Sequence, residues 1–282
     1  MKKFISILLT LILLATAALA AAEEINVISR EDGSGTRGAF IELFGIEQKN
    51  AEGKKIDYTT DDCDITNSTS VMMTSVAGND CAIGYISLGS MNDTVKALKI
   101  DGVEASVENI KNGTYKVARP FNIATKAEVS DAAADFIAFI MSAEGQAVIE
   151  EKGYIAVAEE APAFEGGKVS GKIVIAGSSS VTPVMEKLAE AYMALNTNVE
   201  IELQQSDSSS GMTSAIDGVC DIGMASRVLK DSEIEAGLVP MTIAMDGIAV
   251  IVSNDNPVEG LTTEQVRDIY MGEITDWSEV NE

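Results

Sequence analysis

Residues 29–38 carry the sequence SREDGSGTRG, between a short apolar run at 26–28 and an amphipathic run at 39–44. This pattern predicts a strand, then a loop rich in glycine and serine, then the start of a helix. The first N–H groups of a helix lack internal partners and lie at the positive end of the helix dipole. The stretch therefore suits an oxyanion, and we expect the rest of the chain to be organised around it.

Several side chains of this stretch add hydrogen-bond donors. Ser34 and Thr36 carry hydroxyl groups, and Gly35 lets the backbone approach a ligand closely. Arg30 offers a planar fork of N–H groups that matches a tetrahedral oxyanion better than a lysine does. We expect Asp32 to hold this fork in place. The Asp-Gly-Ser-Gly run taken alone favours a plainer interpretation, a turn followed by a helix N-cap, so the hypothesis needs support from elsewhere in the chain.

The second half of the chain contains two more stretches of this kind. An apolar strand at 172–176 leads into residues 177–183, GSSSVTP, and then into an apolar-periodic helix at 184–195. A strand at 199–204 leads into residues 206–211, SDSSSG. Both stretches again place hydroxyl groups and a helix start after a strand, which favours anion binding.

A weak internal repeat is visible as well. Residues 68–73, a capped helix start, precede a strand at 80–86, and residues 208–213 precede a strand at 220–226 at nearly the same spacing. Two similar lobes, each with a capped helix and a strand, would produce this pattern. Chance similarity between serine-rich helix starts explains it equally well.

The remaining elements are predicted from periodicity and turn residues. Residues 159–170 are the best linker candidate, because they are acidic and contain Pro and Gly. The predictions are an extended segment at 119–124, helices at 131–141 and 144–152, a linker at 159–170, a long strand at 241–252 broken at Asp246-Gly247, and a helix at 261–270 with a capping-box start at Thr262 and Gln265.

The amino terminus has the pattern of a signal peptide. Lys2 and Lys3 precede a mostly apolar run at 4–14, and Ala18-Leu19-Ala20 forms a cleavage site of small residues. We expect residues 1–20 to be removed and the protein to be exported to the periplasm or another extracytoplasmic space. No Cys sits at the cleavage point, so the sequence does not support a lipid anchor there.

Composition limits the function classes. The chain of 282 residues is 46% hydrophobic, which suits one or two globular domains. Its formal charge is −24, and loss of two lysines with the signal peptide leaves 18 basic against 44 acidic residues, or −26. Such a chain should avoid nucleic acids and acidic membrane surfaces. An anion site in it must act through direct donors, since charges are screened over about 8 Å at physiological salt.

Absent residue types exclude common catalytic sites. The chain has no His and no Ser-x-x-Lys, so we expect no enzyme, no metal and no cofactor. Cys63, Cys81 and Cys220 have no metal-ligand spacing. A Cys63–Cys81 disulfide and three buried thiols both remain open.

Five stretches together resemble the phosphate-binding subunit of phosphate ABC transporters. They lie at 29–36, 177–183, 221–227, 244–250 and 272–277, so the match spans nearly all of the chain after the signal peptide. Their order departs from that family, where the Gly-Ser-Ser-Ser block comes near the amino terminus and the Asp-Gly-Ser-Gly-Thr block follows the Trp block. The chain therefore resembles a circular permutant, in which the linker joins the family's old termini.

The resemblance implies an α/β fold of the periplasmic-binding-protein type II, with two lobes joined by two crossing segments. The crossings should lie near Arg119-Pro120 and near 245–247. One lobe, lobe II, is then split between 25–118 and 247–282. The other, lobe I, is continuous over 120–245 and contains the linker.

The resemblance also implies a function and a set of binding residues. The function is an extracytoplasmic receptor that captures inorganic phosphate between its lobes and delivers it to the permease of an ABC transporter, and we expect a monomer. The alternative is a scavenger or sensor of phosphate or another oxyanion that is not coupled to transport. The phosphate-binding residues are Arg30, Ser34, Gly35 and Thr36 from one lobe and Ser179, Ser180 and Ser209 from the other, with Asp32, Ser226 and Arg227 as further candidates. Arg227 stands where a branch of the family has an Asp that accepts the phosphate proton, and Asp207 and Asp246 are the candidates to replace that acceptor.

Overall fold

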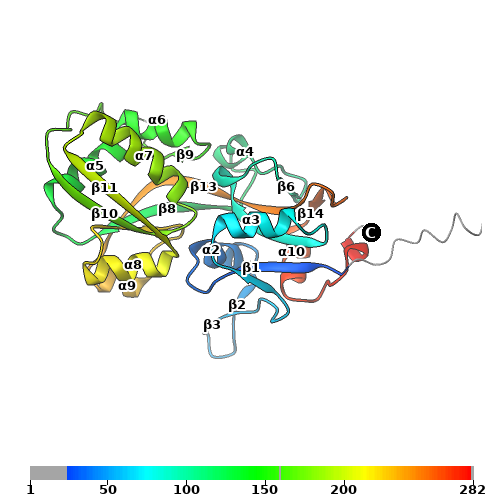
Figure 1. Cartoon of the computed structure of the whole chain (residues 1–282). Helices are drawn as coiled ribbons and strands as arrows, with labels where there is room; N and C mark the ends of the chain where they lie inside the picture. Colours follow the sequence, from blue (N-terminus) through cyan, green and yellow to red (C-terminus); the bar gives the residue numbers. More distant parts are fainter. Residues whose placement is uncertain (1–23, 159, 281–282) are drawn as a thin grey trace, which may run out of the picture.

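The computed structural model describes residues 24–158 and 160–280, so the predicted signal peptide at 1–20 lies outside the described residues. The chain forms a long mixed sheet with the strand order β11-β10-β12-β8-β13-β5-β1-β4, and β6 and β9 pair with β13 beside this path. Around one half of the sheet, α5, α6 and α7 lie on one side and α8 and α9 on the other (Figure 1). The fold is therefore α/β, as predicted, and its main sheet is mixed.

The secondary-structure elements have the following bounds. The strands are β1 (Asn26–Arg30), β2 (Glu47–Lys49), β3 (Lys55–Asp57), β4 (Asp64–Thr66), β5 (Ala82–Ser87), β6 (Val95–Ala97), β7 (Lys99–Ile100), β8 (Ala118–Thr125), β9 (Ile155–Ala156), β10 (Gly171–Ser178), β11 (Val199–Ser206), β12 (Ile222–Ala225), β13 (Val239–Ser253) and β14 (Gly260–Leu261). The helices are α2 (Gly35–Leu43), α3 (Thr69–Ala77), α4 (Val107–Lys111), α5 (Asp131–Ile140), α6 (Ala143–Glu151), α7 (Thr182–Leu195), α8 (Ser208–Asp217), α9 (Asp231–Glu235) and α10 (Thr263–Tyr270).

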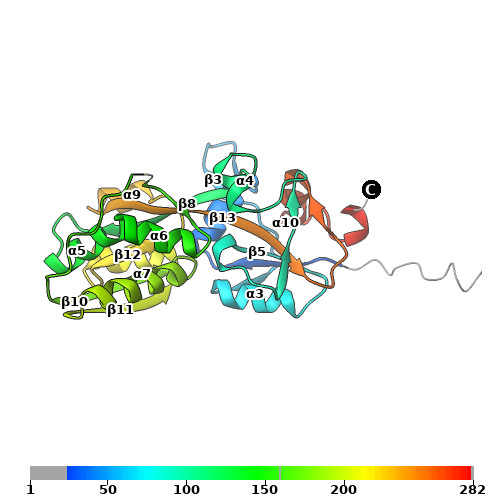
Figure 2. The same ribbon diagram turned by 90° about the horizontal axis from the view of Figure 1, so that it is seen from above.

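Buried apolar side chains form two main cores. The first is built from residues of 25–117 together with residues of 248–277. The second is built from residues of 121–244, and a smaller cluster lies within the same stretch. The two halves lie side by side in both views (Figures 1 and 2). We call the half around the first core the split lobe, because two separate stretches build it, and the other half the continuous lobe.

Strands β8 and β13 pass between the lobes (Figure 1). They pair antiparallel, and their register places Arg119 opposite Asp246 and Ala118 opposite Gly247. The predicted break at Asp246-Gly247 is wrong, since β13 runs unbroken over 15 residues. The pairing with β8 explains this, because it gives the backbone of the crossing its hydrogen-bond partners.

A buried ion pair joins the two crossing strands. Arg119 Nη2 lies 3.2 Å from Asp246 Oδ2, with the side chains 2% and 1% exposed. Burial disfavours both charges, so it raises the pKa of Asp246 and lowers the pKa of Arg119, and their mutual attraction only partly offsets this. Arg119 also donates to the Ser226 carbonyl in the continuous lobe, and the Gly89 N–H in the split lobe donates to Asp246. The pair is thus bonded to both lobes at the crossing.

The carboxyl ends of parallel strands bring four helix starts together. Strand β1 runs parallel to β4, and β10 runs parallel to β11. Helices α2, α3, α7 and α8 follow these four strands directly. Ser34, Ser68 and Asp207 cap α2, α3 and α8 by accepting from a backbone N–H three residues on, and α7 begins with a proline in its first turn. In open α/β sheets this edge is where ligands bind.

The helix predictions were largely correct. Helices α5 and α6 match the predicted ranges, and Thr262 and Gln265 form the predicted capping box of α10. Helix α2 differs, because it begins at Gly35 inside the stretch predicted as a loop. Residues 160–170 contain no helix or strand, but the Phe164 ring packs 5.3 Å from Phe139, so this segment is fixed to the continuous lobe.

Two further features concern the described residues only. No single helix in them is long and apolar enough to cross a membrane, and α5 with α6 would pass on length and composition but meet at 60°. Cys63 and Cys220 are free thiols, so the structure contains no Cys63–Cys81 bridge.

We expect Asp246→Asn to lower the free energy of unfolding by about 3 kcal/mol, because it leaves the Arg119 charge buried without a partner. Urea denaturation measures this loss. The double variant Asp246→Asn with Arg119→Met removes both charges and should recover most of it.

The exposed pair Lys187–Glu190 provides the control, since its side chains are 42% and 60% exposed. Glu190→Gln should change stability by less than about 0.5 kcal/mol. A loss below about 1 kcal/mol in Asp246→Asn would contradict the role that we assign to the buried pair.

Candidate functional site

The guanidinium of Arg30 is buried at the edge where the four helices begin. The residue is 1% exposed. Its Nε and Nη2 donate to the Glu31 carboxylate at 2.8 and 2.7 Å, and Nη2 also donates to Ser179 Oγ at 3.1 Å. Its Nη1 has no hydrogen-bond partner among the described residues. Because a buried donor on a charged group is costly to leave unpaired, this nitrogen indicates a place for an acceptor.

Neighbouring side chains fix the backbone of Arg30. Its N–H donates to the Tyr85 hydroxyl at 3.1 Å, and its carbonyl accepts from Arg37 Nη1 at 2.7 Å. The Tyr85 ring stacks on Phe40 with centroids 3.9 Å apart. Burial raises the pKa of Tyr85 to about 12, so the hydroxyl stays neutral and serves as an acceptor. The Arg30 backbone is therefore fixed at the end of β1, and this sets the direction of its side chain.

Glu31, and not Asp32, holds the guanidinium. The Asp32 side chain is 99% exposed and lies 3.2 Å from Arg37 Nη1. The prediction for Asp32 is thus wrong, because its short side chain projects into solvent at the turn after β1. Glu31, one residue nearer, has the reach to accept both Arg30 bonds.

Hydroxyl groups from both lobes meet beside Arg30. Thr36 Oγ1 in the split lobe lies 2.9 Å from Ser180 Oγ in the continuous lobe. Thr69 Oγ1 lies 3.1 Å from Ser180 Oγ and 3.4 Å from Ser179 Oγ. We call Arg30, Thr36, Thr69, Ser179 and Ser180 the hydroxyl cluster. All five are buried, and each can donate a hydrogen bond to an oxyanion that enters between the lobes.

Ser34 and Gly35 stand at the start of α2. Ser34 is buried, and its Oγ accepts from the Arg37 N–H as the helix cap. A Cβ at Gly35 would lie 2.4 Å from Ser208 Oγ and 2.8 Å from Ser226 Oγ in the opposite lobe. The lobes therefore approach so closely here that any larger side chain would have to displace these two hydroxyl groups.

The structure places Ser209, Ser226 and Arg227 outside the hydroxyl cluster. Arg227 donates to both oxygens of Glu233, at 2.9 and 2.7 Å, and to Ser209 Oγ at 3.2 Å. The Ser209 N–H reaches the Gly33 carbonyl across the lobes at 3.2 Å. Ser226 Oγ bonds to Ser178 Oγ at 3.0 Å. Ser226 and Arg227 therefore stabilise the continuous lobe beside the cluster, and the Arg227 charge is matched by Glu233.

Both carboxylates considered as proton acceptors already have partners. Asp207 accepts from the Ser210 N–H at 2.9 Å as the cap of α8. Burial opposes its charge, but the hydrogen bonds from Ser210 and the neighbouring backbone outweigh burial and lower its pKa. Asp246 is bound to Arg119 in the crossing. Hydroxyl oxygens are the remaining acceptors in the hydroxyl cluster, and each can either donate or accept.

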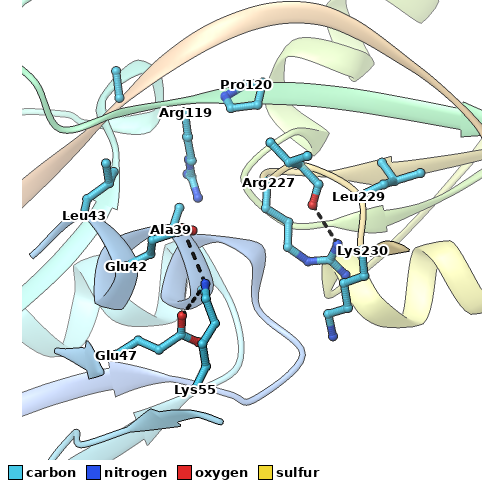
Figure 3. Close-up of a pocket in the computed structure, with 13 residues that line it drawn as sticks. Ala39, Glu42, Leu43, Glu47, Lys55, Arg119, Pro120, Arg227, Leu229 and Lys230 are labelled. Atoms are coloured by element: carbon cyan, nitrogen blue, oxygen red, sulfur yellow. Dashed lines mark hydrogen bonds and ion pairs between the residues drawn. The ribbon is translucent and has the colours of Figure 1, made fainter. Parts of the chain in front are cut away.

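A cavity of about 550 Å³ lies between the two lobes. Its walls come from α2 and the β2–β3 hairpin of the split lobe, from the crossing at Arg119 and Pro120, and from residues 227–230 of the continuous lobe. Figure 3 shows Arg119 extending toward it from β8 and the Glu47–Lys55 pair on the opposite wall. No member of the hydroxyl cluster lines this cavity.

Three residues of the site were missed from the sequence. Glu31 and Tyr85 gave no signal, because a carboxylate beside an arginine and a tyrosine in a strand are common. Thr69 did give one, since residues 68–73 were recognised as a capped helix start that repeats at 208–213. Strand β4 before it has only three residues, which hid the strand, loop and helix pattern.

Comparison with known proteins identifies relatives over most of the chain. The family model described as "PBP superfamily domain" matches residues 9–144 and 162–282. The phosphate-binding protein PstS 2 of Streptococcus agalactiae serotype V is 57% identical over 258 residues, covering 91% of this chain and 88% of the relative. PstS 2 of Streptococcus pneumoniae serotype 4 is 44% identical, covering 94% and 91%. The crystal structure of a phosphate ABC transporter, phosphate-binding protein from S. pneumoniae TIGR4 superposes with a TM-score of 0.72 at 44% identity, covering 92% of this chain and 100% of that one.

We expect Gly35→Ala to weaken binding of a tetrahedral oxyanion at least about tenfold, because the added methyl would collide with Ser208 and Ser226 and keep the lobes apart. Titration calorimetry with phosphate measures this. Gly38→Ala is the matched control on the same helix, since a Cβ there meets nothing within 4 Å. It should leave affinity unchanged and raise stability by up to about 1 kcal/mol. Equal affinities in the two variants would show that lobe contact at Gly35 is not needed for binding.

Proposed function

This chain belongs to the phosphate-binding protein family within the PBP superfamily, and on that premise we propose that it captures inorganic phosphate between its two lobes and delivers it to the permease of an ABC transporter. The observation that carries the proposal is the buried Arg30 guanidinium, whose Nη1 has no partner in the described part of the chain and lies beside hydroxyl groups of both lobes. A dehydrated tetrahedral anion supplies the missing acceptor.

The proposed binding residues follow from this placement. Arg30 contributes its guanidinium, Thr36 its hydroxyl, and the start of α2 its backbone N–H groups and helix dipole. Across the cleft, Ser179 and Ser180 precede α7 and contribute hydroxyl groups. The remaining proposed contacts are Ser34, Gly35 and Ser209, and we assign Ser226 and Arg227 to bracing the continuous lobe.

Binding is proposed to proceed by closure of the lobes. The split lobe is proposed to comprise 25–118 and 247–282, and the continuous lobe 120–245, which the two separate cores support. Phosphate bonds to both lobes only when they are closed, so it has a higher affinity for the closed state and shifts the population toward it. The crossing strands β8 and β13 are the proposed hinge.

We also propose that the chain is a circular permutant of the more common segment order. The described segments around the proposed cut lie side by side, since the Ile25 N–H donates to the Thr275 carbonyl at 2.8 Å. Termini that lie close together are what permutation requires. The S. agalactiae and S. pneumoniae relatives match over nearly their whole length, which supports the same order in them.

The cellular setting is proposed from the family. The receptor acts outside the cytoplasm as a monomer, after removal of residues 1–20, and it performs no chemistry on phosphate. The proposed site binds phosphate through hydrogen bonds alone, so the receptor can release phosphate again.

We expect titration calorimetry to show binding of phosphate at micromolar concentrations or below. Arg30→Lys keeps the charge but loses the planar fork, so it should weaken binding about ten- to hundredfold. Arg267→Lys is the control, because Arg267 lies on α10 with a side chain that is 36% exposed.

A titration with sulfate runs in parallel. If sulfate gives heat of binding and phosphate gives none, the ligand is sulfate and not phosphate. If neither gives heat, the proposed function is wrong. Unchanged phosphate affinity in Arg30→Lys would leave the function intact but remove Arg30 from the binding residues.

A further inference from the structure

We propose that Thr69, the first residue of α3, is a further phosphate-binding residue that donates both its backbone N–H and its hydroxyl to the ligand. The inference rests on the proposed function of the same site. It adds a third strand-loop-helix unit of the hydroxyl cluster, β4 followed by α3, to the two that contain Thr36 and Ser179.

The contacts of Thr69 point into the cluster. The residue is 5% exposed. Its N–H faces Ser179 Oγ at 3.4 Å, and its Oγ1 lies 3.4 Å from Ser179 Oγ and 3.1 Å from Ser180 Oγ. Good N–H···O bonds measure about 2.9 to 3.0 Å, so the N–H is only weakly bonded here. An anion oxygen that enters beside the two serines can give it a shorter bond.

The capping of α3 leaves this N–H available. Ser68 Oγ accepts from the Val71 N–H, which satisfies the donor two residues further along the helix. The N–H of the first helical residue has no partner within the helix, and it lies at the positive end of the dipole of a nine-residue helix. The positive end of α3 therefore lies next to Ser179 and Ser180.

A second observation shows that the cluster lacks an acceptor. The Arg30 guanidinium, bonded through Nη2 to the same Ser179 Oγ, carries the buried Nη1 without a partner among the described residues. Thr69 and Arg30 thus approach one hydroxyl from different elements, and both retain unused donor capacity. A single tetrahedral anion at this point satisfies both.

The arrangement of the two lobes is consistent with this role. In the continuous lobe, α8 follows β11 and precedes β12, and in the split lobe α3 follows β4 and precedes β5. Each helix begins at the interface, with Thr69 and Ser208 as first residues. Each lobe then presents two helix starts to the ligand, α2 with α3 and α7 with α8.

Three substitutions at Thr69 separate its two donors. Thr69→Ser keeps both donors, and Thr69→Val keeps the shape but removes the hydroxyl. Thr69→Pro removes the N–H as well, at a helix position where proline is tolerated, and the extended Ser68 backbone at φ −160° and ψ 161° suits a residue before proline. Thr74→Val is the matched control, since Thr74 is exposed on the same helix.

Phosphate calorimetry and thermal melting with and without phosphate are the measurements. We expect Thr69→Ser and Thr74→Val to bind within about threefold of the parent chain, Thr69→Val to lose about tenfold, and Thr69→Pro about a hundredfold or more. Melting without phosphate should change little in all four, whereas the stabilisation by phosphate should shrink in the order of the lost affinity.

Parental affinity in Thr69→Val and Thr69→Pro would overturn the inference while leaving the phosphate receptor intact. A parent chain that binds no phosphate would overturn both. If Thr69→Pro melts early, Thr69→Val decides alone, since it changes neither the backbone nor the volume of the side chain appreciably.

Discussion

The buried positive charge of Arg30 is the constraint on which the rest of the site depends. A guanidinium removed from water costs several kcal/mol unless its charge and its donors are matched. Glu31 matches one edge, and Tyr85 and Arg37 fix the backbone behind it. Nη1, which has no partner within residues 24–158 and 160–280, leaves that match incomplete. An anion that accepts a hydrogen bond from this nitrogen would complete the match.

The second constraint is how closely the two lobes approach. Oxygens of one lobe lie 2.9 to 3.4 Å from those of the other at the hydroxyl cluster, and Gly35 packs where a methyl group would not fit. Small side chains on both faces permit this approach, and they also leave little room for water around a ligand. Low local dielectric strengthens each hydrogen bond to an anion, so the lobe contact and the affinity have the same physical origin.

Much of this arrangement could be predicted from the sequence. Strand, Gly/Ser loop and helix start are local patterns, and they predict the separate anion-binding stretches. Only the family resemblance predicts that Arg30 and Thr36 lie opposite Ser179 and Ser180, and the structure brings these four residues together. The sequence could not predict which carboxylate pairs with Arg30, because Glu31 and Asp32 differ only in the length and direction of their side chains after β1. The continuity of β13 could not be predicted for a related reason. Its Asp-Gly pair is locally typical of a turn, and only the pairing with β8 keeps the backbone extended.

A net charge of −24 repels anions at long range, but the carboxylates near the site are paired. Glu31 faces Arg30, Glu233 faces Arg227, Asp246 faces Arg119, and Asp207 caps α8. Each nearby negative charge is thus matched by a guanidinium or a helix start, while distant carboxylates are screened by salt. The local balance is then set by Arg30 and the helix starts, whose donors reach the ligand directly. Affinity for an anion in so acidic a protein depends on this matching, and we infer that the abundance of acidic residues elsewhere on the surface has little influence on it.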